Sequence, residues 1–261
     1  LNMQTLELNK YLSSLQTSGQ MNGDIIKDIF MDEKGRTWMA VFPISITIHS
    51  DKYPKYEWFH QSGRDNFLLP NDQITSVIED SDGDIWATTS NGIAYYNQRT
   101  KEWTSLLSNR EQTSQEQNYV FISLCEATRG TILVGGYMSG MYRINKQDMK
   151  PHYFSPQDAG YTNIRPDKYI RCIYRDEEGT IWAGGHYNFK RIDLSNNYIE
   201  HYLTDYPITV ITSKNEQELW VGTVNGIYKF NKKAKKLQQV NLSSEIGNIN
   251  SIWQQDSTLT Y

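Results

Sequence analysis

Cysteine is scarce in this chain, which has only Cys125 and Cys172 among its 261 residues. Two cysteines make neither a disulfide framework nor a cysteine-based metal site. No apolar run approaches the roughly 20 residues that span a bilayer, and no signal peptide is visible. The densest basic group, residues 232–236, is interrupted by an alanine and is typical of a solvated hairpin turn. The sequence therefore argues against a nucleic-acid or anionic-membrane surface.

Aromatic residues, by contrast, are abundant. They make up 13% of the chain, with 18 Tyr and 7 Trp. Disordered segments are poor in such residues, so the composition predicts a folded chain with a sizeable core. The net charge is −4, and at roughly 100–200 residues per domain the length is compatible with one or two domains.

A short motif, Asp-x-x-Gly-x-x-Trp, recurs along the chain. A worn copy has Ala127 and Leu133 in the outer positions, and a further copy with a shorter turn keeps Trp220. A last one begins at Ile249. The complete copies are Asp32, Gly35 and Trp38; Asp80, Gly83 and Trp86; and Asp176, Gly179 and Trp182.

The spacing of these copies predicts the fold. Residues 38, 86, 133, 182 and 220 are successively 48, 47, 49 and 38 residues apart. A period of roughly 40–50 residues built from β-type segments is typical of a propeller blade. In the second copy we expect four strands at residues 74–79, 85–89, 93–97 and 103–107, separated by turn residues. The sequence thus predicts an all-β propeller of four-stranded antiparallel blades.

The motif residues have structural roles in such a blade. Glycine takes a positive φ in the first hairpin turn, and the aspartate accepts backbone N–H bonds there. The tryptophan opens the second strand and is expected to pack between neighbouring blades. Gly92, Gly140 and Gly226 fall at the second turn, where Asn188 is expected to replace glycine in left-handed geometry.

Metal binding by the acidic turn is the alternative interpretation. The spacing lacks the alternating oxygen ligands of a calcium loop. The aspartates lie three residues before glycine, whereas the Asp-box of sialidase-type propellers places them two before it. We expect no metal and no cofactor.

The string I-x-x-I-x-x-D-x-x-G-x-I-W-x-x-T-x-x-G-I-x-x-Y resembles the two-component regulator propeller repeat. The resemblance covers most of residues 24–261 and weakens after Trp38. It implies the periplasmic ectodomain of an inner-membrane hybrid two-component sensor. Such sensors have two propellers, a further β-domain, a membrane helix and a cytoplasmic histidine kinase, and a homodimeric full-length protein is expected.

The resemblance implies that this chain is a fragment of a larger propeller protein. Residues 1–23 are expected to hold the outer strand of a preceding blade and a connection. Residues 24–247 should form five complete blades, and residues 248–261 the start of an incomplete one. Exposed strand edges in such a piece favour pairing with another chain.

Function is expected on the face that carries the second-to-third strand turns and the blade-to-blade connections. Two turns depart from the repeat, one by an inserted residue and one by its His-Tyr pair. Amphipathic aromatic rings on this face can stack on a sugar ring, and the guanidinium group of an arginine can hold the carboxylate of an acidic sugar. The alternative hypotheses are that the aromatic rings only cover blade edges and that the arginine pairs with Asp158 or Asp167. The predicted ligand-binding residues are Tyr137, His186, Tyr187, Asn188, Arg165 and Asn91.

No catalytic arrangement stands out. Glycoside hydrolysis needs two carboxylates at a defined separation, and no spacing marks such a pair. Our first hypothesis is a non-catalytic sensor that recognises an oligosaccharide or relays its presence to a kinase. The alternatives are a scaffold for protein association and a carbohydrate-active lyase or hydrolase on the same fold.

Overall fold

The computed structural model describes residues 25–42, 45–50, 53–59, 69–108, 120–154, 157–158, 168–241, 247–255 and 258–260. Within these ranges the secondary structure is entirely β, without a helix and so without one able to cross a membrane. The chain divides into two compact units, Leu1–Leu106 and Leu107–Tyr261, which we describe one at a time.

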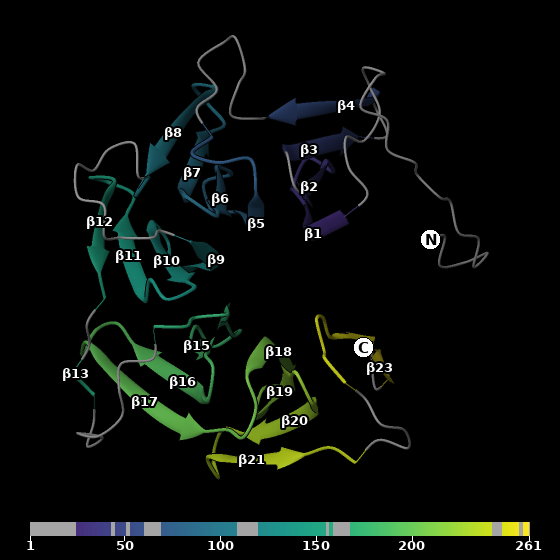
Figure 1. Ribbon diagram of the computed structural model, residues 1–261, viewed down its shortest axis with the longest axis vertical. Helices are drawn as coiled ribbons and strands as arrows, with labels where there is room; N and C mark the ends of the chain where they lie inside the picture. The colour runs from purple at the N-terminus through teal and green to yellow at the C-terminus, as the bar shows by residue number, and fades with distance from the viewer. Residues whose placement is uncertain are drawn as a thin grey trace. The chain divides into compact units, whose positions relative to one another are not determined.

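Every blade is an antiparallel meander in chain order, and the fold is a β-propeller with five such blades (Figure 1). The first unit holds β1 (Ile25–Met31), β2 (Thr37–Phe42), β3 (Ser45–Ser50) and β4 (Tyr53–Phe59), then β5 (Ile74–Glu79), β6 (Ile85–Thr89), β7 (Gly92–Asn97) and β8 (Glu102–Leu106).

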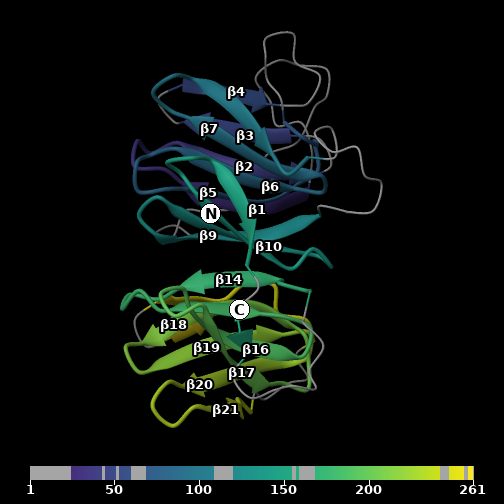
Figure 2. The same cartoon turned by 90° about the vertical axis from the view of Figure 1, so that its left-hand side faces the viewer.

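The second unit holds the remaining three blades and a two-stranded sheet (Figure 2). A short parallel strand, β13 (Gln157–Asp158), borders the fourth blade. The third blade is β9 (Phe121–Thr128), β10 (Thr131–Gly136), β11 (Met141–Asn145) and β12 (Lys150–Tyr153); the fourth is β14 (Cys172–Arg175), β15 (Ile181–Gly184), β16 (Asn188–Asp193) and β17 (Tyr198–Leu203); the fifth is β18 (Ile208–Asn215), β19 (Glu218–Thr223), β20 (Gly226–Asn231) and β21 (Lys236–Gln239); the last sheet is β22 (Trp253–Gln255) and β23 (Thr258–Thr260).

The four strands predicted for the second copy are confirmed to within one residue at each end. The first blade also forms its β2–β3 hairpin, although its sequence has no glycine at that turn. The outer strand predicted within residues 1–23 lies outside the described residues.

The aspartate of the motif fixes its own turn and also binds the tryptophan six residues later. In the fourth blade, Asp176 Oδ1 accepts the Thr180 N–H at 2.8 Å, and Asp176 Oδ2 accepts the Trp182 indole N–H at 2.8 Å. The same indole-to-carboxylate bond measures 2.9 Å from Trp38 to Asp32 and 2.8 Å from Trp86 to Asp80. The predicted turn role is confirmed, and the indole bond adds a second function to the same carboxylate.

Trp38 and Trp182 pack between neighbouring blades, as predicted. In the first unit, Trp38 joins a core that includes Phe59 of its own blade and Ile74, Ala87 and Tyr96 of the next. In the second unit, Trp182 packs with residues of the fifth blade such as Phe230, whose ring centroid is 5.3 Å away.

The third copy has lost the aspartate and the tryptophan together. Ala127 and Leu133 are both buried in the apolar core between the third and fourth blades. A tryptophan alone would bury an indole N–H without the carboxylate, and an unsatisfied buried donor costs about 1–3 kcal/mol. Replacing both partners by apolar residues avoids that cost.

Glycines that lie two residues after the tryptophan position of the motif (Leu133, Trp182 and Trp220) let neighbouring sheets approach closely. A Cβ on Gly135, Gly184 or Gly222 would lie 2.3, 2.4 or 2.8 Å from the Cγ2 atom of an isoleucine in the following segment. Those isoleucines are Ile170, Ile208 and Ile249. The glycines therefore serve close packing between sheets, and at Gly135 and Gly136 the register of β10 with β9 also shifts.

Polar side chains also link one blade to the next. Gln98, just after β7, accepts hydrogen bonds from Lys34 Nζ and Arg36 Nη2 beside the first motif turn. Lys232, just after β20, pairs with Asp176 at 2.8 Å and Glu178 at 2.5 Å in the fourth blade. Both Gln98 and Lys232 lie twelve residues after the tryptophan of their own copy.

These contacts determine the charge state of Asp176. Burial alone would raise the pKa of this carboxyl, but hydrogen bonds from Lys232, Trp182 and the Thr180 N–H outweigh it and hold the pKa below its ordinary value of 3.8. Asp176 therefore stays ionised at neutral pH, where it stabilises the fold through the linkage of protonation to folding.

We expect Asp176→Ala to lower the free energy of unfolding by about 2–4 kcal/mol, because it leaves the buried Trp182 indole N–H without its acceptor and leaves the Lys232 ammonium with Glu178 alone. Urea denaturation followed by tryptophan fluorescence measures the effect. The deficit should shrink as the pH falls through the lowered pKa of Asp176, since the wild type then loses the same contribution. Glu177→Ala removes an exposed neighbouring carboxylate and should change stability by at most about 0.5 kcal/mol; equal effects of the two substitutions would contradict this assignment.

Gly184→Ala should destabilise the second unit by about 1–3 kcal/mol, because the new methyl group meets Ile208 Cγ2 at 2.4 Å and Cys172 Sγ at 2.7 Å. Gly247→Ala is the control, since no atom lies within 4 Å of its Cβ position. Thermal denaturation of the two variants and of Gly184→Ala/Ile208→Ala tests the contact. The double variant should lose less than the sum of the single losses; additive losses would refute the proposed clash.

Candidate functional site

The second-to-third strand turns meet the blade-to-blade connections, as predicted. In the third blade the Tyr137 N–H donates to Val120 O at 2.8 Å, and the Gly140 N–H donates to Lys168 O at 2.9 Å. In the fourth blade the Thr204 N–H donates to Tyr187 O at 3.1 Å. The connections thus hold these turns by backbone hydrogen bonds that do not involve the side chains of Tyr137 and Tyr187.

The third-blade turn has the inserted residue that the sequence indicates. The register of β10 and β11 pairs Gly135 with Met141, and the Gly136 N–H closes the turn on Gly140 O at 2.9 Å. Met138 and Gly140 both have positive φ, at 60° and 72°. The extra residue widens the turn that presents Tyr137.

The fourth-blade turn corrects one prediction. Asn188 does not adopt a positive φ; it is the first residue of β16, is buried, and its carbonyl accepts the Gly185 N–H at 2.8 Å. The matching glycines Gly92 and Gly226 have φ values of 110° and 104°. These lie well beyond the left-handed well near +57° that asparagine tolerates, so an asparagine there requires a different turn.

Three of the predicted residues come together with a fourth aromatic side chain. The ring centroids of Tyr137 and Tyr169 are 4.7 Å apart, those of Tyr169 and His186 are 5.4 Å apart, and those of His186 and Tyr187 are 4.4 Å apart. The first and last pairs meet edge to face, an arrangement favoured between aromatic rings. We call these four residues the aromatic row; it runs from the third blade to the fourth.

The ends of the aromatic row are exposed. Tyr137 retains 50% of its accessible surface and Tyr187 retains 55%, whereas Tyr169 and His186 are half-buried between them. A tyrosine ring combines an apolar face with a polar hydroxyl, which suits surfaces where one side is wet. Such a row can stack against a pyranose ring and hydrogen-bond to its hydroxyls.

Sequence reasoning missed Tyr169. It lies directly before Ile170, the apolar residue that opens the fourth copy and packs on Gly135. Val120 and Pro207 lie at the same place in other copies. Their carbonyl groups accept backbone hydrogen bonds from the second-to-third strand turns. This position therefore faces the turns, a property that is visible only once the strands and connections are placed.

The other predicted residues do not belong to the row. Asn188 is buried, so it cannot contact a ligand directly. Asn91 belongs to the first unit, where its backbone N–H donates to Thr89 Oγ1 at 3.1 Å in the β6–β7 turn. Arg165 lies outside the described residues.

The two thiols offer no competing reactive site. Burial raises the pKa of both Cys125 and Cys172 to about 12, so neither forms a thiolate nucleophile at neutral pH. Among the residues that the structure describes, no group of three or more His, Cys, Asp and Glu side chains is placed to hold a metal ion.

Comparison with known proteins identifies the repeat. The model of the two-component regulator propeller matches residues 68–91 and 164–187, which include the motifs of the second and fourth blades. No curated protein sequence matches this chain at a significant level.

Solved structures share the fold. The extracellular domain described as that of a hybrid two-component system from B. thetaiotaomicron is 17% identical, with a TM-score of 0.76 over 94% of this chain and 33% of that one. The extracellular domain of a one-component system from the same organism is 16% identical, with a TM-score of 0.52 over 93% of this chain and 40% of that one. Virginiamycin B lyase from Staphylococcus aureus is 15% identical, with a TM-score of 0.67 over 90% of this chain and 74% of that one.

At these identities the likeness shows the fold alone, and the chain spans a third of the first of these structures. The matched repeat agrees with the resemblance noted in the sequence, and both structural neighbours from B. thetaiotaomicron are extracellular domains of signalling systems. The chain is therefore a β-propeller in which two stretches match the two-component regulator propeller repeat.

Proposed function

We propose that this chain is the recognition part of a periplasmic sensor propeller and that the aromatic row binds an oligosaccharide. The observation that carries the proposal is the row itself, in which two exposed tyrosines flank two half-buried rings on the turn-bearing face. The extracellular character of the neighbouring sensor domains supports the proposed location.

Binding at the row offers a way to change the packing of two blades. Tyr137 and Tyr169 contact each other from different blades, and Gly140 donates to Lys168 O beside them. A ligand that contacts both sides favours one relative arrangement by its differential affinity for it. In the full sensor this bias would pass to the remaining domains and to a histidine kinase, with a homodimer as the signalling unit.

The proposed role is non-catalytic. The aromatic row contains no carboxylate, and a glycosidase mechanism needs two. A lyase shares the fold, so incubation of oligosaccharides with the chain and analysis of the products separates recognition from cleavage.

We expect Tyr187→Ala and Tyr137→Ala each to weaken oligosaccharide binding by about five- to tenfold, because a stacked aromatic contact contributes about 1–1.5 kcal/mol. A glycan array identifies a binding oligosaccharide, and calorimetric titration of that compound measures the affinities.

His152→Ala is the control, because His152 carries an exposed ring on the outer strand β12. It should leave the affinity unchanged. Undiminished binding by both row variants would remove the row from the site, and equal losses in all three variants would indicate a general structural effect.

A further inference from the structure

The exposed large hydrophobic side chains that the structure describes in the second unit gather beside the aromatic row. They are Tyr137, Met138, Tyr153 and Tyr187, which keep 50%, 58%, 49% and 55% of their accessible surface. Exposed apolar side chains that gather at one place indicate a binding surface more often than scattered ones do. Met138 lies in the same turn as Tyr137, whereas Tyr153 comes from the outer strand β12 and does not belong to the row.

Strand register places Tyr153 beside the third-blade turn, residues 137–140. Tyr153 is the direct partner of Tyr142 in the pairing of β11 with β12. The Phe154 N–H donates to Met141 O at 2.8 Å, so the end of β12 reaches the first residue after the turn. Tyr137 and Tyr153 therefore border the same turn.

Gly140, the last residue of that turn, lets the Tyr153 ring lie directly against it. A Cβ on Gly140 would lie 2.7 Å from both the Cε2 and the Oη atoms of Tyr153. On another side, the Tyr142 ring meets the Tyr153 ring at an angle of 78°, with 5.3 Å between the centroids. These contacts hold the Tyr153 ring in place while half of its surface stays open. A side chain that is ordered before binding loses little conformational entropy on binding, which favours affinity.

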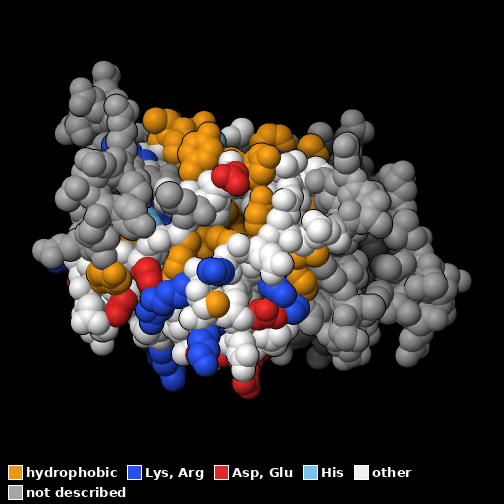
Figure 3. All heavy atoms as spheres, turned by 90° about the horizontal axis from the view of Figure 1, so that it is seen from below, with side chains coloured by type: hydrophobic (Ala, Val, Ile, Leu, Met, Phe, Trp, Pro, Cys, Tyr) orange, Lys and Arg blue, Asp and Glu red, His pale blue; other side chains and the backbone are white. Residues whose placement is uncertain are grey.

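The ends of the blades that carry the motif turns have a different surface chemistry. Lys232 and Lys235, which follow β20, pair with Asp176 and Glu200 of the fourth blade at 2.8 and 2.5 Å. Figure 3 shows hydrophobic side chains, tyrosines included, mainly in the upper half of the surface seen from below, and Lys and Arg side chains mainly in the lower half. Charged and aromatic side chains are thus separated on the surface rather than mixed.

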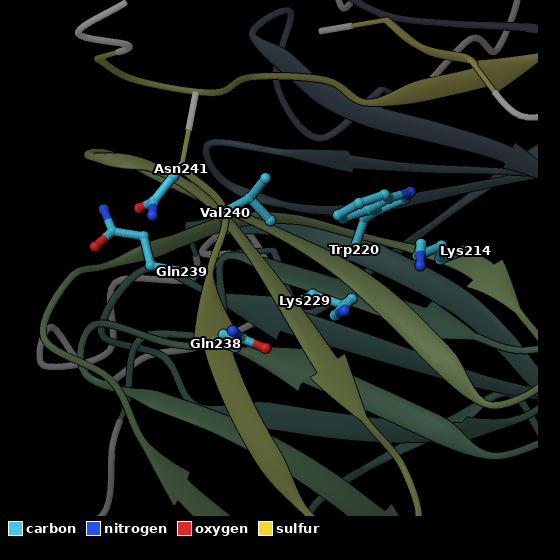
Figure 4. Close-up of a pocket in the computed structure, with 7 residues that line it drawn as sticks. All are labelled: Lys214, Trp220, Lys229, Gln238, Gln239, Val240 and Asn241. Carbon is cyan, nitrogen blue, oxygen red and sulfur yellow. The ribbon is translucent and has the colours of Figure 1, made fainter. Parts of the chain in front are cut away.

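The hollow of the fifth blade offers no aromatic surface that could continue the row. Figure 4 shows the lining of this hollow of about 280 Å³, which includes Trp220 from β19 and Lys229 from β20. Trp220 is only 8% exposed, and the Lys214 Nζ lies 5.2 Å from its ring centroid, so the indole presents no open face. The open ring of Tyr153 on the third blade is the better continuation.

We propose that Tyr153 is a further stacking position of the oligosaccharide site, which therefore selects a long oligosaccharide that runs from Tyr187 across the third-blade turn to Tyr153. The ring supplies an apolar face and a hydroxyl, as the tyrosines of the row do. This inference rests on the proposed function of the aromatic row and adds the length of the ligand as the selected property.

The test measures affinity against ligand length with the intact chain. The probes are fragments of galactan, arabinan, xylan, mannan and polygalacturonate, each series running from the disaccharide to the hexasaccharide. In calorimetric titration, the affinity of the wild type for the bound series should keep rising up to the longer fragments. Tyr153→Ala should bind the hexasaccharide about five- to tenfold more weakly, because one stacked contact is lost, and should bind the disaccharide as the wild type does.

Two further variants separate the extension from the row. Tyr187→Ala should weaken binding of short and long fragments alike, since it removes one end of the row. His152→Ala, an exposed neighbour on the same strand, should follow the wild type at every length. Tyr153→Phe keeps the ring and should restore most of the affinity for the hexasaccharide.

Nitration of tyrosines by tetranitromethane tests the same contact in the wild type, without a substitution that could disturb the turn. Mass spectrometry should show that the hexasaccharide protects Tyr153 and that the disaccharide does not. Equal length profiles of Tyr153→Ala and the wild type, or nitration of Tyr153 that the hexasaccharide leaves unchanged, overturns the extension. The row itself stands in that case if Tyr187→Ala still weakens binding. If no fragment of any series binds the wild type, the row and its extension are both wrong.

Discussion

One carboxylate in each complete copy of the repeat joins a local turn to the packing of neighbouring blades. Asp176 shows both functions, because one oxygen accepts a backbone N–H of the turn and the other accepts the Trp182 indole. The indole is thereby held in the orientation in which its ring packs on the next blade. A turn that opens would release the tryptophan, so turn formation and blade packing are energetically coupled.

That coupling explains how the copies diverge. The third blade replaces the aspartate and the tryptophan together, and the result is a continuous apolar contact. The fifth blade keeps Trp220 but has Lys214 at the place of the aspartate, six residues before it, where the ammonium lies over the ring. The two positions thus change together, to an apolar contact in the third blade and to a cation–π contact in the fifth.

Much of this scaffold could be predicted from the sequence because it depends on local signals that repeat. Period, strand positions and the packing of the tryptophans all follow from residues at constant spacing. The indole bond of Asp176, the Lys232 contact and the ring of Tyr169 could not be predicted so readily, because they join residues that meet only after the blades pack. The prediction for Asn188 is wrong for a different reason. The identity of the residue suggests a left-handed backbone conformation, but it does not specify the φ value that the turn requires.

Backbone hydrogen bonds to the blade-to-blade connections hold the second-to-third strand turns that present Tyr137 and Tyr187. The Tyr137 N–H donates to Val120 O, and the Tyr187 carbonyl accepts the Thr204 N–H. Neither tyrosine ring is therefore needed to close its turn. Their exposure is then not explained by the fold, and exposed aromatic side chains that gather at one place mark a binding surface more often than scattered ones do. The scaffold can therefore stay constant while the exposed side chains of these turns change.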